Sequence, residues 1–257
     1  INWIEQTLGA ISIDIILSTS EHLDIFWQEA FGCKKIIRAG LPRNEVLHRP
    51  PSSHELINTL EETKSPLADD KKYILWVPTF TPDGSIPWWH RPTVITQLSS
   101  TASNYGYTLV IKPHPYDEQK FHNTHLIDFK NVIFVDPNID IYPDLHKFSC
   151  LITDRSSLMF DFLQLNRPIL ILESSNQQNN TPVLWFDNLP VPAVCGLDVN
   201  SAEILEKCLT KDDKEDARKE CLQKLFTTDQ SDANNHIIKI LKKILHEKIV
   251  CNLNILN

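Results

Sequence analysis

Apolar runs and amphipathic stretches alternate along most of this chain. Two short β-branched runs, 11–17 and 34–38, flank an amphipathic segment at 21–31 that Ser20 caps and Gly32 ends. A helical period between two extended runs predicts a βαβ unit, and a crossover of this kind joins parallel strands. The N-terminal part of the chain is therefore expected to be α/β.

A longer alternation begins at residue 73. Its apolar runs are nearly continuous, which is typical of strands that are covered on both faces. The expected strands are 73–77, 107–112, 132–135, 150–153 and 169–172, and the expected helices between them are 93–104, 117–124, 141–147 and 156–165. Strands that alternate with helices in this way predict a doubly wound parallel sheet, so the fold class is α/β and Rossmann-like.

A loop-rich stretch at 39–70 carries Pro42, Pro50 and Pro51 and predicts a domain boundary. The C-terminal part is expected to be helical, at 201–209, 212–226 and 232–247. We assign 1–50 to the end of a first α/β domain, 51–230 to the doubly wound domain, and 231–257 to a terminal helix and tail.

Composition narrows the class of protein. The 257 residues are 42% hydrophobic and carry a formal net charge of −8, so no global charge favours nucleic acid as a partner. Six cysteines occur without a CxxC pair, which indicates free thiols in a reducing compartment and hence a cytoplasmic location. No apolar run reaches membrane-spanning length. The first residues lack a basic leader and an initial Met, so we expect the start of a longer protein to be missing.

In open α/β sheets, ligands bind beyond the carboxyl ends of the strands. The run that ends at residue 111 is followed by Lys112-Pro113-His114-Pro115. The two prolines exclude helix at Lys112 and His114 and hold a cation and an imidazole in a rigid loop. A site for phosphate favours such preorganised donors.

The run that ends near residue 152 leads into Thr153-Asp154-Arg155-Ser156-Ser157 and then a helix. The first amides of a helix and two hydroxyls can bind an anion there. A simple N-cap explains Asp154 or Ser156 equally well.

Two further strand ends carry polar residues. Thr79 follows the run at 73–77, and Glu173 follows the run at 169–172, where a carboxylate can accept ribose hydroxyls. A proline-shaped loop and a solvated strand end are the plain alternatives. Glycine-rich phosphate loops and HExxH zinc motifs do not occur in the sequence. No structural metal is expected; a divalent cation near Asp154 and Asp161 is left open.

Four segments of the chain, taken in order, resemble segments of the CDP-glycerol glycerophosphotransferase family. Members of that family polymerise and prime teichoic acids and related capsules. The resemblance spans about 11–187. The matching segments are Gly40-Leu41-Pro42-Arg43-Asn44-Glu45-Val46-Leu47, Ile74-Leu75-Trp76-Val77-Pro78-Thr79-Phe80, Val110-Ile111-Lys112-Pro113-His114-Pro115, and Leu151-Ile152-Thr153-Asp154-Arg155-Ser156-Ser157 with Phe160-Asp161-Phe162 and Arg167-Pro168.

The resemblance implies a GT-B architecture, in which 1–50 would be the end of the acceptor-side domain and 51–230 the donor nucleotide-binding domain. It implies transfer of a phosphoalditol from a CDP-alditol to an acceptor hydroxyl, with release of CMP. The acceptor would be a polymer or lipid-linked, which favours a peripheral position at the inner face of the cell membrane.

The resemblance also implies roles for individual residues. His114 is the essential histidine of the HP motif and would be catalytic. Ser156, Ser157, Lys112, Arg155 and Thr153 would bind the donor phosphates, and Glu173, Thr79, Arg43 and Asp154 would lie at the nucleotide, the ribose or the cleft.

Two departures from the family pattern are clear. The family has Tyr where this chain has Arg155, and the family's second essential histidine, in an N-terminal His-Gly segment, has no counterpart here. The chain could therefore bind donor without catalysing. Two alternatives stay open, a GT-B glycosyltransferase that uses a nucleotide sugar and a non-catalytic nucleotide-binding module.

Overall fold

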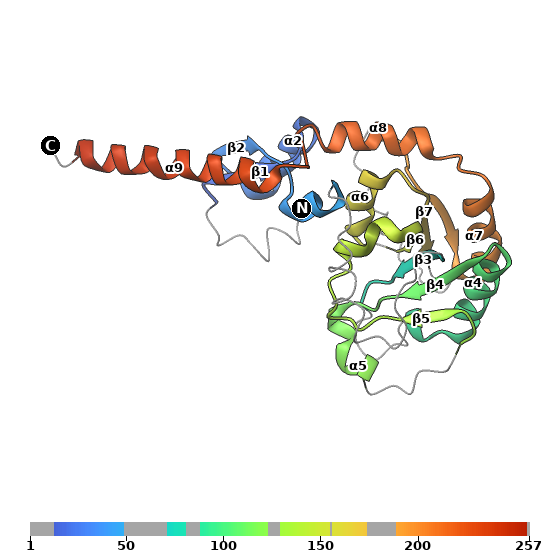
Figure 1. Cartoon of the computed structure of the whole chain (residues 1–257). Helices are drawn as coiled ribbons and strands as arrows, with labels where there is room; N and C mark the ends of the chain where they lie inside the picture. The colour runs from blue at the N-terminus through green and yellow to red at the C-terminus, as the bar shows by residue number, and fades with distance from the viewer. Residues whose placement is uncertain are drawn as a thin grey trace. The chain divides into compact units, whose positions relative to one another are not determined.

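The computed structural model describes residues 13–48, 71–80, 88–122, 129–154, 156–173 and 189–255 (Figure 1). Contacts divide the chain into two compact units, Ile1–Arg49 with Leu222–Asn257, and Pro50–Cys221. Residues 222–230 thus fall with the N-terminal segment, although the sequence assigned them to the doubly wound domain.

The first unit contains the expected βαβ element. Strands β1 (Ile15–Ser18) and β2 (Lys35–Arg38) pair in parallel, and helix α2 (Glu21–Phe31) connects them. Gly32 ends α2 as predicted, with a left-handed φ of 57° and its amide donating to the Gln28 carbonyl. Ser20 occupies the N-cap position, but within the described structure its hydroxyl makes no capping bond, so that part of the prediction is wrong.

The C-terminal part of the chain belongs to this unit because hydrogen bonds link it to the N-terminal part. Thr19 Oγ1 donates to the carbonyl of Leu225 at 2.6 Å, and the amide of Asn234 donates to Glu45 at 2.9 Å. The last bond joins helix α9 (Ala233–Ile255) to the 3₁₀ helix η1 (Pro42–His48). Such distant pairings leave no trace in local periodicity, which explains why the sequence did not predict them.

The second unit is a six-stranded, wholly parallel sheet. Its strands are β3 (Lys72–Val77), β4 (Tyr107–Ile111), β5 (Val132–Phe134), β6 (Phe148–Thr153), β7 (Ile169–Glu173) and β8 (Val194–Leu197), in the order β5-β4-β3-β6-β7-β8. The first three strands build outward in one direction, and the chain then returns to place β6 beside β3. The predicted doubly wound α/β fold of GT-B type is therefore confirmed.

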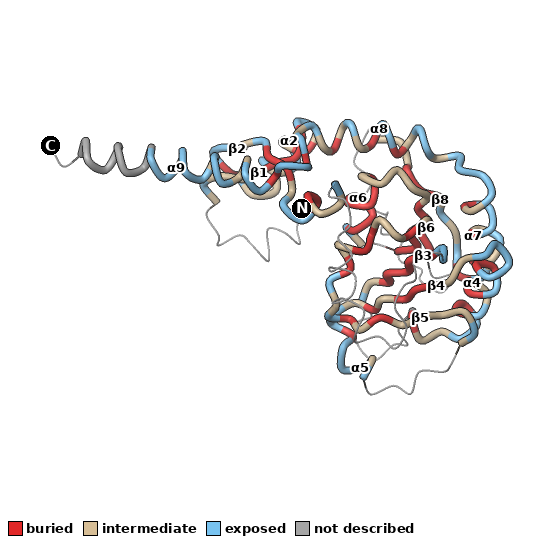
Figure 2. The backbone as a smooth tube through the Cα atoms, viewed as in Figure 1, coloured by how far each residue is buried: buried red, intermediate tan, exposed pale blue. Residues whose placement is uncertain are grey.

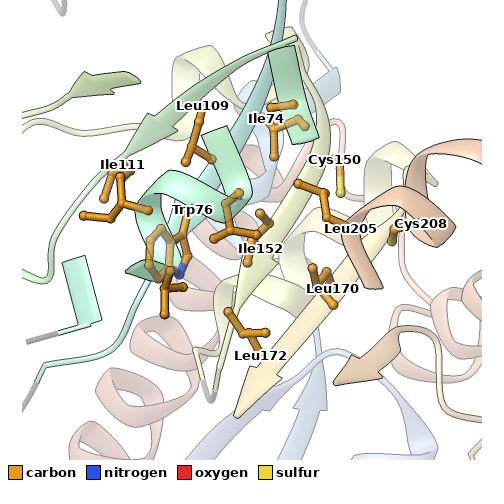
Figure 3. Packing of buried hydrophobic residues seen from close by; sticks show 14 of the residues in the cluster. Ile74, Trp76, Leu109, Ile111, Cys150, Ile152, Leu170, Leu172, Leu205 and Cys208 are labelled. Atoms are coloured by element: carbon orange, nitrogen blue, oxygen red, sulfur yellow. The ribbon is translucent and has the colours of Figure 1, made fainter. Parts of the chain in front are cut away.

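Both faces of the sheet are covered, as the continuous apolar runs predicted (Figure 2). Alternate strand residues point to one face, where they pack against helices α4 (Pro92–Asn104) and α7 (Ser201–Thr210) (Figure 3). Leu98 of α4 and Leu205 of α7 are fully buried in this cluster. The strand residues that alternate with this set, such as Leu75 and Leu151, point to the other face of the sheet and are fully buried there.

Several predicted helices are shorter or of a different type. The segment expected at 141–147 is a 3₁₀ helix, η4 (Tyr142–Lys147), with Pro143 in its first turn. The segment expected at 117–124 divides into η3 (Pro115–Asp117) and α5 (Glu118–His122), and that at 156–165 into α6 (Leu158–Phe162) and η5 (Leu163–Leu165). Prolines and short crossovers favour such tight turns over regular α-helix.

The remaining described elements are η2 (Trp88–His90), η6 (Asp198–Asn200) and α8 (Glu215–Leu225). Strand β8 was not predicted, because its four residues are half exposed and include Gly196. A Cβ at Gly196 would lie 2.6 Å from the Ile204 side chain, so glycine lets α7 pack closely on this strand. Among the described helices, none is both long enough and apolar enough to cross a membrane.

Candidate functional site

The switch in strand order places one pocket at the carboxyl edge of the sheet. Strands β4 and β5 lie on one side of β3 and strands β6 to β8 on the other, so the loops after β3 and β6 diverge. Ligands in open α/β sheets bind at such a switch point. A pocket of about 200 Å³ opens here, lined by Val77, Pro78, Thr79, Lys112, Pro113, His114, Pro115, Ile141, Tyr142, Ser156, Ser157 and Leu158.

His114 is held in one orientation at the rim of this pocket. Its Nδ1 accepts a hydrogen bond from the backbone amide of Tyr116 at 3.1 Å. A neutral imidazole that accepts at Nδ1 carries its hydrogen at Nε2 and can donate from there. Burial lowers the pKa of His114, and this effect outweighs the opposing charge of Asp117. The site therefore presents a neutral imidazole donor at neutral pH.

Lys112 supplies the cation of the pocket. It follows β4, and its backbone amide continues the ladder by donating to the Trp76 carbonyl at 3.0 Å. Its Nζ donates to the Pro137 carbonyl at 2.7 Å, a bond that fixes the long side chain against the loop after β5. Burial lowers the pKa of Lys112, and the carboxylates of Asp140 and Asp136 oppose the shift. An ammonium has three donors, so Lys112 Nζ can donate to a ligand in addition to the Pro137 carbonyl.

Ser156 and Ser157 face the pocket from the turn between β6 and α6. The Ser156 hydroxyl accepts from the amide of Leu158 at 3.3 Å. Ser157 is exposed and stands at the N-cap of α6, where its side chain makes no capping bond within the described structure. The N-cap interpretation thus fits Ser156 in part, and Ser157 is an exposed residue of the pocket lining.

Asp154 and Thr79 bind each other across the gap between the two diverging loops. The Thr79 hydroxyl donates to one Asp154 oxygen at 2.6 Å, and the Thr79 amide donates to the other at 3.0 Å. Asp154 is buried, and this pair ties the loop after β3 to the loop after β6. The pair therefore shapes the pocket, with Thr79 lining it and Asp154 behind it.

The other predicted site residues lie elsewhere. Thr153 is fully buried, and its hydroxyl donates to the Val77 carbonyl at 3.0 Å rather than lining the pocket. Glu173 ends β7, at the same edge of the sheet but outside the pocket lining. Arg43 is an exposed residue of η1 in the first unit, and Arg155 lies outside the described residues.

Tyr142 is a lining residue that sequence reasoning missed. Its hydroxyl donates to Asp161 of α6 at 2.6 Å, and its backbone amide donates to the Asp140 carboxylate at 3.0 Å. Asp161 is fully buried and thus anchors the Tyr142 ring in the wall of the pocket. The signal that could have found it is topological, since β5 ends at the same edge of the sheet and its following loop begins there.

Arg167, which belongs to the last segment of the family resemblance, lies at the amino edge of the sheet, opposite the pocket. Its Nη1 donates to the Phe148 carbonyl at 2.6 Å, at the start of β6, and also to the carbonyl of His146. Burial lowers its pKa. Among the described residues no three His, Cys, Asp or Glu side chains group closely enough to hold a metal ion.

The fold and the pocket define a doubly wound α/β domain of the GT-B type, with polar donors at the topological switch point of its sheet. The chain belongs to the family described as CDP-Glycerol:Poly(glycerophosphate) glycerophosphotransferase, whose profile matches residues 5–243. The resemblance expected from the sequence is thereby confirmed.

Named relatives agree with this membership. The teichoic acid poly(glycerol phosphate) polymerase of Bacillus spizizenii strain W23 is 29% identical over 163 residues, which cover 61% of this chain and 40% of that protein. The teichoic acid ribitol-phosphate primase of the same strain is 27% identical over 141 residues, which cover 53% and 34% of the two chains.

A solved structure supports the fold. The wall teichoic acid polymerase TagF matches with a TM-score of 0.72 at 19% identity, over 96% of this chain and 61% of that one. The match to the first curated relative covers about two fifths of that relative's length.

Proposed function

We propose that the pocket binds the diphosphate of a CDP-alditol and that the protein transfers glycerol-phosphate or ribitol-phosphate to an acceptor hydroxyl, releasing CMP. The observation that carries this proposal is the convergence of His114, Lys112 and two serines on one pocket at the switch point. The names of the relatives, which include glycerol-phosphate polymerases and a ribitol-phosphate primase, support the choice of donor.

The proposed reaction is a phosphoryl transfer. The acceptor oxygen attacks the distal phosphorus of the donor, the bond from that phosphorus to the bridging oxygen breaks, and CMP leaves with the electron pair. The acceptor hydroxyl loses its proton to a base. Catalysis of such a step depends mainly on positioning and on stabilising charge that develops on phosphate oxygens.

Each lining residue has a distinct proposed part in this step. His114 donates from Nε2 to a phosphate oxygen of the leaving CMP, because its Nδ1 already accepts from a backbone amide. Lys112 supplies positive charge beside it, and the hydroxyls of Ser156 and Ser157 bind the diphosphate from the other side of the pocket. The Thr79–Asp154 pair keeps the two sides at a constant separation.

Three predicted ligands have weaker support. Thr153 is left out of the proposal because its hydroxyl is used inside the sheet. Glu173 remains a proposed ribose partner on the strength of its place at the end of β7, and Arg43 a proposed cleft residue by resemblance.

The test compares His114→Ala with a matched histidine outside the pocket. His122 lies on α5 near Asp136, so His122→Ala is the control. CMP release from CDP-glycerol or CDP-ribitol in the presence of a lipid-linked acceptor should fall about 100- to 1,000-fold in His114→Ala, the effect of losing one preorganised donor. His122→Ala should retain turnover.

Several outcomes would contradict the proposal. Equal turnover in the two variants would remove His114 from the mechanism. Release of UDP from a UDP-sugar, with no CMP from either CDP-alditol, would favour a glycosyltransferase. Calorimetry with CDP separates the last alternative, since binding without turnover indicates a nucleotide-binding module and no binding defeats every nucleotide-based function.

We also propose that the protein works on the cytoplasmic side of the membrane and contacts it peripherally. Helix α9 exposes Ile238, Leu241 and Leu245 at helical spacing on one face, with Lys242 and Lys243 beside them. An apolar stripe flanked by lysines suits the surface of an anionic bilayer. Leu241→Glu should reduce co-sedimentation with phosphatidylglycerol vesicles, and unchanged co-sedimentation would contradict the proposal.

A further inference from the structure

Two aromatic rings stand exposed beside the pocket. Tyr116, in η3, is 78% exposed, and Phe80, in the loop after β3, is 45% exposed. The Tyr116 ring lies 4.9 Å from the His114 ring and 5.4 Å from the Phe80 ring, centroid to centroid. Phe80 meets Tyr116 edge to face, at 75° between the ring planes. These rings form an aromatic patch directly beside the imidazole that lines the pocket.

The backbone that carries Tyr116 is rigid, although the ring itself is exposed. The amide of Asp117 donates to the His114 carbonyl at 2.8 Å and closes the turn. The buried Asp117 carboxylate accepts from Trp89 Nε1 at 3.2 Å and pairs with Lys120 at 3.1 Å. A ring presented on so firmly held a turn loses little conformational entropy when a ligand covers it.

The pocket that the described residues line is smaller than a pocket that encloses an entire nucleotide. Its volume is about 200 Å³, below the roughly 300–1,000 Å³ of pockets that enclose a whole small ligand. Its donors, a cation, an imidazole and two hydroxyls, suit phosphate. The described pocket thus accounts for the diphosphate, and the aromatic patch adjoins it at His114 and Pro115, on the surface where a nucleoside would continue.

Building on the proposed function, we infer that the Tyr116 ring is the stacking platform for the cytosine base of the donor. A base offers a flat π-face that an aromatic ring can cover, whereas an acceptor made of alditol phosphates is a flexible anionic chain without such a face. Phe80 supports the platform from its edge and keeps the Tyr116 ring upright. The phosphates then enter the pocket past His114.

The test exploits a feature of the loop. The hydrogen bond that orients His114 comes from the backbone amide of Tyr116, so Tyr116→Ala removes the ring and keeps that bond. Calorimetry with CDP should show affinity about 5- to 100-fold weaker for Tyr116→Ala, the effect of losing one stacked base. Tyr116→Phe and Tyr116→Trp should bind CDP as the unaltered protein does.

Pyrophosphate has no base, so its affinity, measured by competition against CDP, distinguishes a loss of base stacking from a loss of phosphate binding. Its own affinity should be the same in the unaltered protein and in Tyr116→Ala. The matched control is Tyr105→Ala, because Tyr105 is an exposed tyrosine at the opposite edge of the sheet, where it donates to Glu206. Its CDP affinity should not change. Circular dichroism confirms that each variant is folded.

Failure of the Tyr116 inference and failure of the proposed function give different results in these measurements. The inference fails if Tyr116→Ala binds CDP normally, if Tyr116→Phe loses as much affinity as Tyr116→Ala, or if pyrophosphate affinity falls in parallel. These results would leave the proposed function standing, provided that the unaltered protein binds CDP. Absence of CDP binding by the unaltered protein would instead defeat the proposed function itself.

Discussion

Asp144 is a buried carboxylate that should destabilise the folded protein at neutral pH. It lies in the first turn of η4, its side chain is fully buried, and neither of its oxygens has a hydrogen-bond partner in the described structure. Burial raises its pKa from an ordinary 3.8 to about 6, against the charge of Lys147 and with a smaller contribution from Asp140. Asp144→Asn removes the ionisation and keeps the shape.

The sign and size of the change in stability follow from the difference between the folded and unfolded pKa of Asp144. Because the folded pKa is the higher one, the native state holds the proton more tightly between about pH 4 and 6, and stability falls as pH rises through that window. At neutral pH, a shift of about two pKa units corresponds to about 3 kcal/mol. Asp144→Asn should therefore raise the free energy of unfolding by up to about 3 kcal/mol at about pH 7.5, and by only about 0.5 kcal/mol at about pH 4.

Urea unfolding of the second unit, which contains Asp144, measures the free energy of unfolding of Asp144→Asn and of the unaltered protein at the two pH values. For a domain of this size the gain at neutral pH corresponds to a rise in Tm of about 6–10 °C. Asp216→Asn is the control, because Asp216 is an exposed residue of α8. Equal stability of Asp144→Asn and the unaltered protein at neutral pH would refute the reasoning, and so would a gain that persists undiminished at low pH.

Three further substitutions test other contacts. Arg218→Ala should destabilise the second unit by about 2–4 kcal/mol, because the buried guanidinium donates to the one-third exposed Asp212 at 2.8 Å. Gly40→Ala should cost the first unit about 1–3 kcal/mol, since its Cβ would lie 2.8 Å from that of Ala233. Thr79→Val should cost about 1–3 kcal/mol and weaken CDP binding, because the bond across the pocket loops is lost. Thermal unfolding checks all three, and calorimetry checks the last.

Each of these has its own control. Lys219→Ala, beside Arg218 but exposed, should change stability by less than about 0.5 kcal/mol. Adding Ala233→Gly to Gly40→Ala should recover part of the loss, and additive losses would contradict the steric account. Thr79→Ser keeps the hydroxyl and should retain CDP affinity; an equal loss in Thr79→Ser and Thr79→Val would show that the hydroxyl is not responsible.

Local pattern predicted most of the fold because strand and helix periods are local properties. Helix α2 begins and ends where Ser20 and Gly32 indicated, although the Ser20 hydroxyl makes no cap. The strands that line the site begin or end within two residues of their expected limits. Strand β8 was not predicted, because its four half-exposed residues are too few to give a recognisable strand pattern.

The candidate site was partly predictable for a topological reason. Parallel strands end at one edge, so residues directly after them gather there whatever the strand order. His114, Lys112, Ser156, Ser157 and Thr79 all line the pocket on that basis. The same rule could not show which side chains turn inward, because that depends on pairing between strands.

The amino-acid sequence by itself determined the alternation of strands and helices, the placing of polar groups at strand ends, and the rigid loop around His114. Each depends on neighbours in the chain. Tertiary structure alone decided that β6 returns beside β3 and that Thr153 bonds to Val77 while Asp154 bonds to Thr79. Those contacts join residues about 75 positions apart, and no local preference encodes which distant backbone a side chain will meet.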